Sequence, residues 1–123
     1  MAETTASEHR IDIETGVRRV RVEFDGTTVA DSTSALTLLE TGKPPRYYLP
    51  RADVRLDLLV PTEKVTHCPY KGDAEYWSVR TGEALHENVA WSYPTPIPQS
   101  EAIAGLICFY SERVDEYVDG APS

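Results

Sequence analysis

The clearest pattern in the sequence is a strict alternation of polar and apolar residues in short runs. Residues Arg19–Phe24 alternate in this way, and Asp25-Gly26 separates them from Thr27–Asp31. A period of two predicts β-strands, and Asp-Gly between two such runs is the sequence form of a tight β-hairpin. We therefore predict a hairpin here, with ordered structure beginning at Val17 or later.

Short runs rich in β-branched and aromatic residues follow along the chain, separated by Gly and Pro. They predict strands in six further segments, which are 34–39, 46–49, 73–79, 87–93, 106–110 and 114–118. Together with the hairpin, this makes about eight short strands at turn-punctuated spacing, which indicates an all-β sandwich, barrel or folded sheet.

Two segments predict helical turns, and one predicts a connector. In Ala52–Leu59, a period near 3.6 puts Val54 and neighbouring leucines on one side of a helix, with Asp53 near its start. Residues Gln99–Ala104 can form a single helical turn. Thr66–Gly72 is rich in turn-forming residues and predicts a connector between strands.

Length and composition fit one globular domain. The chain has 123 residues, of which 41% are hydrophobic and 26% charged, an ordinary balance for a soluble domain. We expect a single domain over residues 11–120, a flexible polar tail at 1–10 and a short tail at 121–123. A chain of this length buries about two thirds of its unfolded surface, so it needs no disulfide or structural metal.

Charge and cysteine content narrow the partners and the compartment. The formal net charge of −8 repels phosphate backbones and anionic lipids, so we expect neither nucleic acid nor membrane as a partner. The longest largely apolar run, Ala102–Tyr110, is shorter than the roughly 20 residues that span a bilayer. Two cysteines and no secretory pattern at the start predict a reduced, cytoplasmic protein. The oligomeric state stays open.

Six short motifs carry a resemblance to a known family. They are Val29-Ala-Asp-Ser32, Tyr47-Tyr-Leu-Pro50 followed by Arg51 and Asp53-Val54, Cys68-Pro-Tyr-Lys-Gly72, Trp91-Ser-Tyr-Pro94, Phe109-Tyr110 and Asp119-Gly120. In this order and spacing, from about His9 to Gly120, the chain resembles the family of domain of unknown function 427, which also carries a provisional nucleotidyltransferase label.

The resemblance implies a mainly β, compact fold of bent antiparallel sheets with one or two short helices. This fold is similar to the β-tent of methionine sulfoxide reductase B and Mss4-like proteins. Those proteins often hold zinc with two Cys-x-x-Cys pairs, and this sequence has no such pair. We therefore expect a metal-free domain without a cofactor.

Aromatic and basic residues predict a ligand pocket. Trp91 and Tyr93 share one face of a predicted strand, while Tyr48, Arg51 and Lys71 lie on segments beside it. Rings stack on a planar ligand, and Arg51 could hold a carboxylate or a phosphate. We predict a small-ligand-binding domain that uses Tyr48, Arg51, Trp91 and Tyr93 for a small anionic or planar ligand. The same residues also suit a β-protein core and its rim.

An enzyme is the alternative function. Cys68 is the candidate nucleophile or redox centre, because Lys71 and the backbone of the turn could stabilise its thiolate. The simpler interpretation is a small residue buried in a tight turn. Cys108, in an apolar run, is expected in the core.

Nucleotidyl transfer, the activity of the provisional label, needs carboxylates that hold Mg²⁺ and a loop that cradles a triphosphate. Asp73 and Glu75 would share one strand face. A carboxylate pair of this spacing is expected by chance in so acidic a chain, and no phosphate-binding glycine motif accompanies it. These residues give the label no support.

Overall fold

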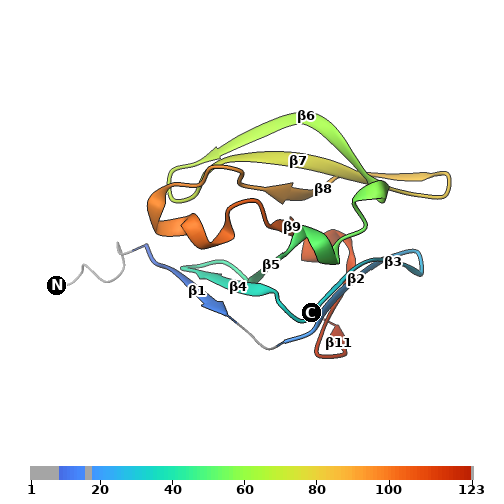
Figure 1. Cartoon of the computed structure of the whole chain (residues 1–123), viewed down its shortest axis with the longest axis horizontal. Helices are drawn as coiled ribbons and strands as arrows, with labels where there is room; N and C mark the ends of the chain where they lie inside the picture. Colours follow the sequence, from blue (N-terminus) through green and yellow to red (C-terminus); the bar gives the residue numbers. More distant parts are fainter. Residues whose placement is uncertain (1–8, 16–17, 123) are drawn as a thin grey trace.

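The computed structural model describes residues 9–15 and 18–122. Antiparallel strands, joined by turns and short 3-10 helices, make up its fold (Figure 1). The strands are β1 (Ile11–Thr15), β2 (Val20–Phe24), β3 (Thr27–Ser32), β4 (Leu36–Glu40), β5 (Arg46–Leu49), β6 (Leu59–Cys68), β7 (Gly72–Thr81), β8 (Ala84–Ser92), β9 (Ile107–Phe109), β10 (Asp115–Val118) and β11 (Ala121–Pro122). The 3-10 helices are η1 (Arg51–Asp53), η2 (Leu56–Leu58), η3 (Pro98–Ile103) and η4 (Ser111–Arg113).

The strands form two antiparallel sheets. The larger has the order β1-β4-β5-β9-β8-β7-β6, and the smaller has the order β11-β10-β2-β3. In Figure 1, β6, β7 and β8 lie above β1, β4 and β5, with β9 between them, so the larger sheet is strongly bent. The mainly β, antiparallel fold class is therefore confirmed. Within the described residues, no helix has the length and apolar character that a membrane crossing requires.

The predicted hairpin is formed by β2 and β3. Asp25 and Gly26 both have positive φ, at 50° and 84°, as the central residues of a two-residue hairpin turn require. The partners Phe24 and Thr27 close the turn. The sequence therefore encodes this hairpin locally.

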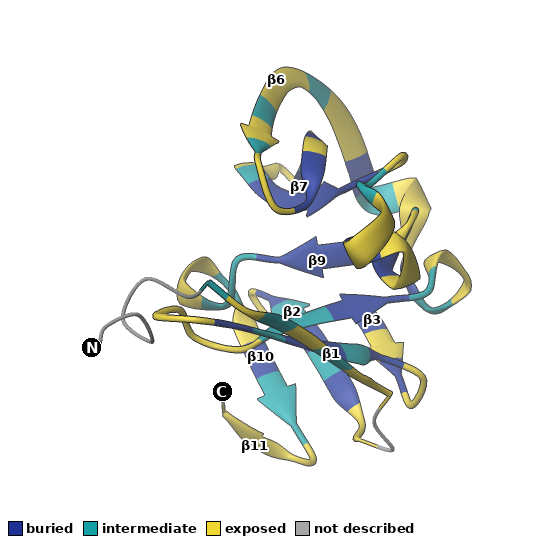
Figure 2. Cartoon of the chain, turned by 90° about the vertical axis from the view of Figure 1, so that its left-hand side faces the viewer, coloured by how far each residue is buried: buried dark blue, intermediate teal, exposed yellow. Residues whose placement is uncertain are grey.

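Both faces of the larger sheet are buried near its middle. A first core cluster joins it to the smaller sheet and contains Val20, Val22, Phe24, Val29, Leu49, Val79, Val89, Ala90, Ile107 and Phe109, among others. A second cluster covers the opposite face and contains Leu38, Tyr48, Ala74, Tyr76, Trp91, Tyr93, Ile103 and Cys108. Successive residues of β9 alternate between the two clusters, so the whole strand is buried (Figure 2).

The predicted helix over Ala52–Leu59 is wrong. Two 3-10 turns, η1 and η2, occupy this segment, and Val54 between them is extended and bridges to Ala30. The Asp53 carboxylate accepts a hydrogen bond of 2.7 Å from Ser32 Oγ. Pairing with β3 therefore outweighs the weak helical periodicity, and every helix among the described residues is a 3-10 turn.

Ordered structure begins earlier than predicted. Strand β1 pairs with β4 along its whole length, from Ile11 opposite Glu40 to Thr15 opposite Leu36. His9 and Arg10, expected in a flexible tail, also contact the end of β4. Residues 1–8 lie outside the described range. At the other end, Ala121–Pro122 pairs with β10 instead of forming a tail.

Strand β6 was not predicted. Its last three residues were expected in a connector, and the sequence offers little alternation because most of the strand is exposed. It forms one edge of the larger sheet, and its pairing with β7 is interrupted between Pro61 and Val65. Bulges and prolines are typical of edge strands, which is why a hydrophobic pattern fails to reveal this one.

Candidate functional site

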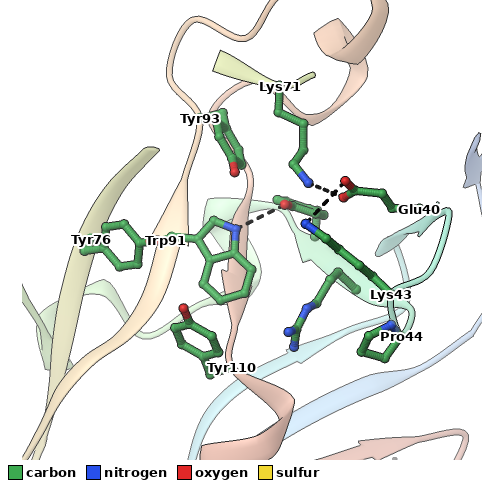
Figure 3. A pocket seen from close by; sticks show the side chains of 10 residues that line it. Glu40, Lys43, Pro44, Lys71, Tyr76, Trp91, Tyr93 and Tyr110 are labelled. Atoms are coloured by element: carbon green, nitrogen blue, oxygen red, sulfur yellow. Dashed lines mark hydrogen bonds and ion pairs between the residues drawn. The ribbon is translucent and has the colours of Figure 1, made fainter. Parts of the chain in front are cut away.

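A cavity of about 160 Å³ opens between the two halves of the bent sheet. We call it the central cavity (Figure 3), and its lining residues are Glu40, Lys43, Pro44, Arg46, Tyr48, Lys71, Tyr76, Trp91, Tyr93 and Tyr110. Three of these side chains are cationic, one is acidic and five are aromatic. The cavity therefore differs sharply in charge from the acidic protein around it.

Glu40 is the only acidic residue among the described lining residues, and it is almost fully buried. One carboxylate oxygen accepts a 2.5 Å hydrogen bond from Lys71 Nζ, and the two side chains are 3% and 9% exposed. The other oxygen lies 2.8 Å from His9 Nε2 and 3.5 Å from Lys43 Nζ. Burial by itself would raise the pKa of Glu40, but the hydrogen bond and charge of Lys71 outweigh it and hold this pKa below its ordinary value.

The backbone around Lys71 is fixed from two sides. Its N–H donates to the Cys68 carbonyl at 3.1 Å, and its own carbonyl accepts from the Ile97 N–H at 2.9 Å. The next residue, Gly72, has φ +116°, and a Cβ at this position would lie 3.3 Å from Pro96 Cα. Only glycine fits this conformation without strain, so the turn that carries Lys71 depends on Gly72.

The aromatic wall of the cavity is built around Trp91. Its indole Nε1–H donates to the Tyr48 hydroxyl at 3.1 Å. The Tyr110 ring meets the indole edge to face at 4.6 Å, and the Tyr76 ring lies 6.3 Å away on β7. These contacts hold flat apolar surfaces in place around the cavity.

Arg46 extends this wall with a positive charge. Its guanidinium lies 5.4 Å from the Trp91 ring centroid and 5.6 Å from that of Tyr110. Glu112 accepts both guanidinium hydrogen bonds, at 2.8 and 3.2 Å. Burial would lower the pKa of Arg46, but the hydrogen bond with Glu112 outweighs it and raises this pKa, so Arg46 stays charged.

Tyr93 brings a hydroxyl group to the cavity. The residue is only 6% exposed, and its hydroxyl points into the cavity (Figure 3). No residue of the described part of the chain hydrogen-bonds to this hydroxyl. Burial raises the pKa of both Tyr93 and Tyr48, so the two phenols stay protonated and able to donate hydrogen bonds.

Four of the residues singled out in the sequence line this one cavity. They are Tyr48, Lys71, Trp91 and Tyr93. Arg51 does not join them, because its Nε donates to the Gly105 carbonyl at 2.8 Å and its guanidinium lies over the Trp77 ring. Arg46 provides the guanidinium of the cavity instead.

Cys68 lies apart from the charged centre of the cavity. Its side chain is partly buried against the second core cluster. The ammonium group of Lys71 hydrogen-bonds to Glu40 and not to the thiol. A nucleophilic role for Cys68 stays a prediction. Cys108 is fully buried, which confirms its expected place in the core, and burial raises the pKa of its thiol.

The two acids considered for nucleotidyl transfer lie on the exposed face of β7. Asp73 pairs with His67 at 2.7 Å, and both side chains are largely solvent-exposed. Among the residues that the structure describes, no group of three or more His, Cys, Asp or Glu side chains is arranged to hold a metal ion. The central cavity is therefore the better candidate site.

Six lining residues were missed in the sequence, namely Glu40, Lys43, Pro44, Arg46, Tyr76 and Tyr110. Glu40 and Lys71 are 31 residues apart, and Glu40 and His9 are also 31 residues apart. Such long separations leave no local signal in the sequence.

The fold and the cavity define a small antiparallel β domain with a cavity lined by aromatic and cationic side chains. The family described as "Domain of unknown function (DUF427)" matches residues 12–120, so the chain belongs to this family. This confirms the resemblance seen in the sequence, although the description gives no activity. No curated protein matches the chain.

Proposed function

We propose that this domain binds a small, planar organic anion in the central cavity. The observation that carries the proposal is the Tyr93 hydroxyl, a donor on a side chain that is 6% exposed, aimed into the cavity and without a partner in the described residues. The hydroxyl faces the cavity, where a ligand oxygen can accept its proton.

The charges around the cavity favour an anion. Lys43, Arg46 and Lys71 line it together with one carboxylate, that of Glu40. The charge of Arg46 is balanced by Glu112 from outside the lining, which leaves an excess of one positive charge. In a small cavity this local excess acts more strongly on a ligand than the distant charges that give the protein its net −8.

The aromatic side chains favour a planar molecule. Trp91 and Tyr110 are fixed by their mutual contact, and the Tyr48 hydrogen bond also holds the Trp91 ring in place. Rigid rings bind flat ligands with little loss of conformational entropy. A small aromatic or conjugated acid is therefore the ligand class that combines both requirements.

A charge series on one ring tests this proposal. Benzoate, benzamide and benzylamine have similar shapes but carry a negative, zero and positive charge. Isothermal titration calorimetry should rank benzoate above benzamide, and benzamide above benzylamine. Equal or tighter binding of benzylamine would refute the proposal.

Variants locate the binding in the cavity. Tyr93→Phe removes one hydrogen bond to a charged ligand, so benzoate affinity should fall about tenfold. Lys71→Met should weaken benzoate binding by at least as much. The matched control is Arg80→Met, at an exposed position of β7 outside the lining, and it should leave the affinity unchanged.

We also retain the prediction that the protein resides in the cytoplasm. Cys68 and Cys108 are both unpaired in the structure, which supports a reducing compartment. Fractionation of cells that produce the protein would test this prediction.

A further inference from the structure

Three separate polar groups in the central cavity can each donate a hydrogen bond to a ligand from a single atom. The Tyr48 oxygen accepts the Trp91 indole N–H, and within the described chain nothing accepts the Tyr48 hydroxyl proton. The Tyr93 hydroxyl is likewise unpartnered there. Lys71 uses one ammonium N–H on Glu40, and an ammonium group has three. Each of the three groups can therefore donate at least one hydrogen bond to a ligand.

The geometry suited to a carboxylate is already occupied. Carboxylates are typically held by the two parallel donors of a guanidinium group. Arg46 is the only arginine among the described lining residues, and its Nη1 and Nη2 donate to the two carboxylate oxygens of Glu112, at 2.8 and 3.2 Å, so this parallel pair of donors is taken. The remaining donors are separate groups, and they suit one charged oxygen better than two.

We infer that the hydroxyls of Tyr48 and Tyr93, together with the Lys71 ammonium group, form a seat for one anionic oxygen attached to a planar conjugated system. The ligand class is a phenolate or an enolate. This inference rests on the proposed function and deepens it, because it names the charged group that the cavity recognises. We call these three side chains the oxygen seat.

The electrostatics of the two phenols support the seat. Tyr48 and Tyr93 line the same cavity, and burial raises the pKa of both phenols. At a pH at which a ligand phenol with an ordinary or low pKa is ionised, both tyrosine hydroxyls therefore remain protonated. The Trp91 N–H polarises the Tyr48 hydroxyl and strengthens it as a donor.

The seat should change the ionisation of a bound phenol. If it binds the anion tenfold more tightly than the neutral form, the pKa of the bound phenol falls by one unit, and a shift of about this size is expected. The probe is 4-nitrophenol, whose ionised form absorbs visible light, titrated against pH with saturating protein and without protein.

Two tyrosine variants assign the shift to the seat. Tyr93→Phe and Tyr48→Phe each remove a donor and keep the ring, so each should reduce the shift by at least half. The control Tyr117→Phe, on β10 outside the cavity, should leave it unchanged. Circular dichroism identifies any variant that fails to fold. In that case Lys71→Gln, which removes the positive charge of the seat, takes its place and should also reduce the shift.

The outcomes separate this inference from the proposed function. A bound 4-nitrophenol whose pKa equals or exceeds its solution value would overturn the seat, as would a shift that persists in both tyrosine variants. Binding of benzoate without binding of 4-nitrophenol would overturn the seat and leave the proposed function standing. If neither probe binds, both are wrong.

Discussion

The buried pair of Glu40 and Lys71 makes the sharpest prediction about this fold, because its two single substitutions should have unequal effects. Glu40→Gln removes the anion and leaves the Lys71 ammonium group buried at 9% exposure. Lys71→Met removes the cation, but Glu40 keeps His9 at 2.8 Å and Lys43 at 3.5 Å. The acid has substitute partners and the lysine has none among the described residues.

The magnitudes follow from this difference. Breaking a buried ion pair so that one charge stays uncompensated costs about 3–5 kcal/mol. The amide oxygen of Gln can still accept from Lys71, so Glu40→Gln should cost about 3 kcal/mol, the lower end of this range. Lys71→Met loses one charge-assisted hydrogen bond of a still-paired acid, which costs about 1.5 kcal/mol. For a chain of 123 residues, 3 kcal/mol corresponds to a fall in Tm of about 12 °C.

Urea unfolding, followed by circular dichroism, measures both losses at neutral pH. The double variant Glu40→Gln/Lys71→Met should lose less stability than the sum of the single variants, because neither charge is then left alone. The reasoning is refuted if Lys71→Met costs as much as Glu40→Gln, or if the two losses simply add.

The change of folding stability with pH provides a second test of the Glu40–Lys71 pair. The pKa of Glu40 in the folded protein lies below its ordinary value of 4.5. Stability from this group is therefore present above pH 4.5 and is lost as the pH falls through the folded-state pKa. The difference in stability between the native protein and Glu40→Gln should shrink on acidification below about pH 4. A difference that grows would contradict the assignment.

Two further experiments test the turn that carries Lys71 and the burial of the core. Gly72→Ala should lower the free energy of unfolding by about 2–3 kcal/mol, because residue 72 has a φ of +116° and an added Cβ would contact Pro96. The control Gly42→Ala has open space around it and should cost about 1 kcal/mol. Equal losses in urea unfolding would contradict the close approach of Gly72 to Pro96. Iodoacetamide should alkylate Cys68 in the folded protein and Cys108 only after unfolding, because Cys108 is fully buried and its thiol pKa is raised. Peptide mass mapping measures the alkylation rate of each cysteine, and similar rates for the two in the folded protein would contradict this prediction.

The parts of the fold that were predicted correctly are those encoded by neighbouring residues. The β2–β3 hairpin is one example, because Asp25 and Gly26 adopt the positive φ that its turn needs. Strand β1 could also have been found, since Ile11 and Ile13 alternate with acids and pack on the second core cluster. Strand β6 is different, since as an exposed edge it takes its conformation from pairing with β7 and leaves little pattern.

The candidate site likewise contains some residues that the local sequence predicts and others that only the folded sheet brings together. Trp91 and Tyr93 are two residues apart and both belong to the second core cluster, so their shared face follows from the period of a strand. Lys71 and Glu40 meet only because the larger sheet bends and brings the β6–β7 turn to the end of β4 (Figure 3). No pattern within either segment specifies that meeting.

Arg46 lines the cavity where Arg51 was predicted to do so, and strand geometry explains why. Tyr48 faces the central cavity, and side chains two residues apart on a strand share a face, so Arg46 on the same strand must face the cavity as well. In the register of β4 with β5, Leu38 lies opposite Arg46. Directly opposite residues share a face, and Glu40 follows Leu38 by two positions. Once Tyr48 is assigned to the cavity and the register is known, Arg46 and Glu40 therefore follow, whereas Arg51, beyond Pro50 on a connector, is not bound by this rule.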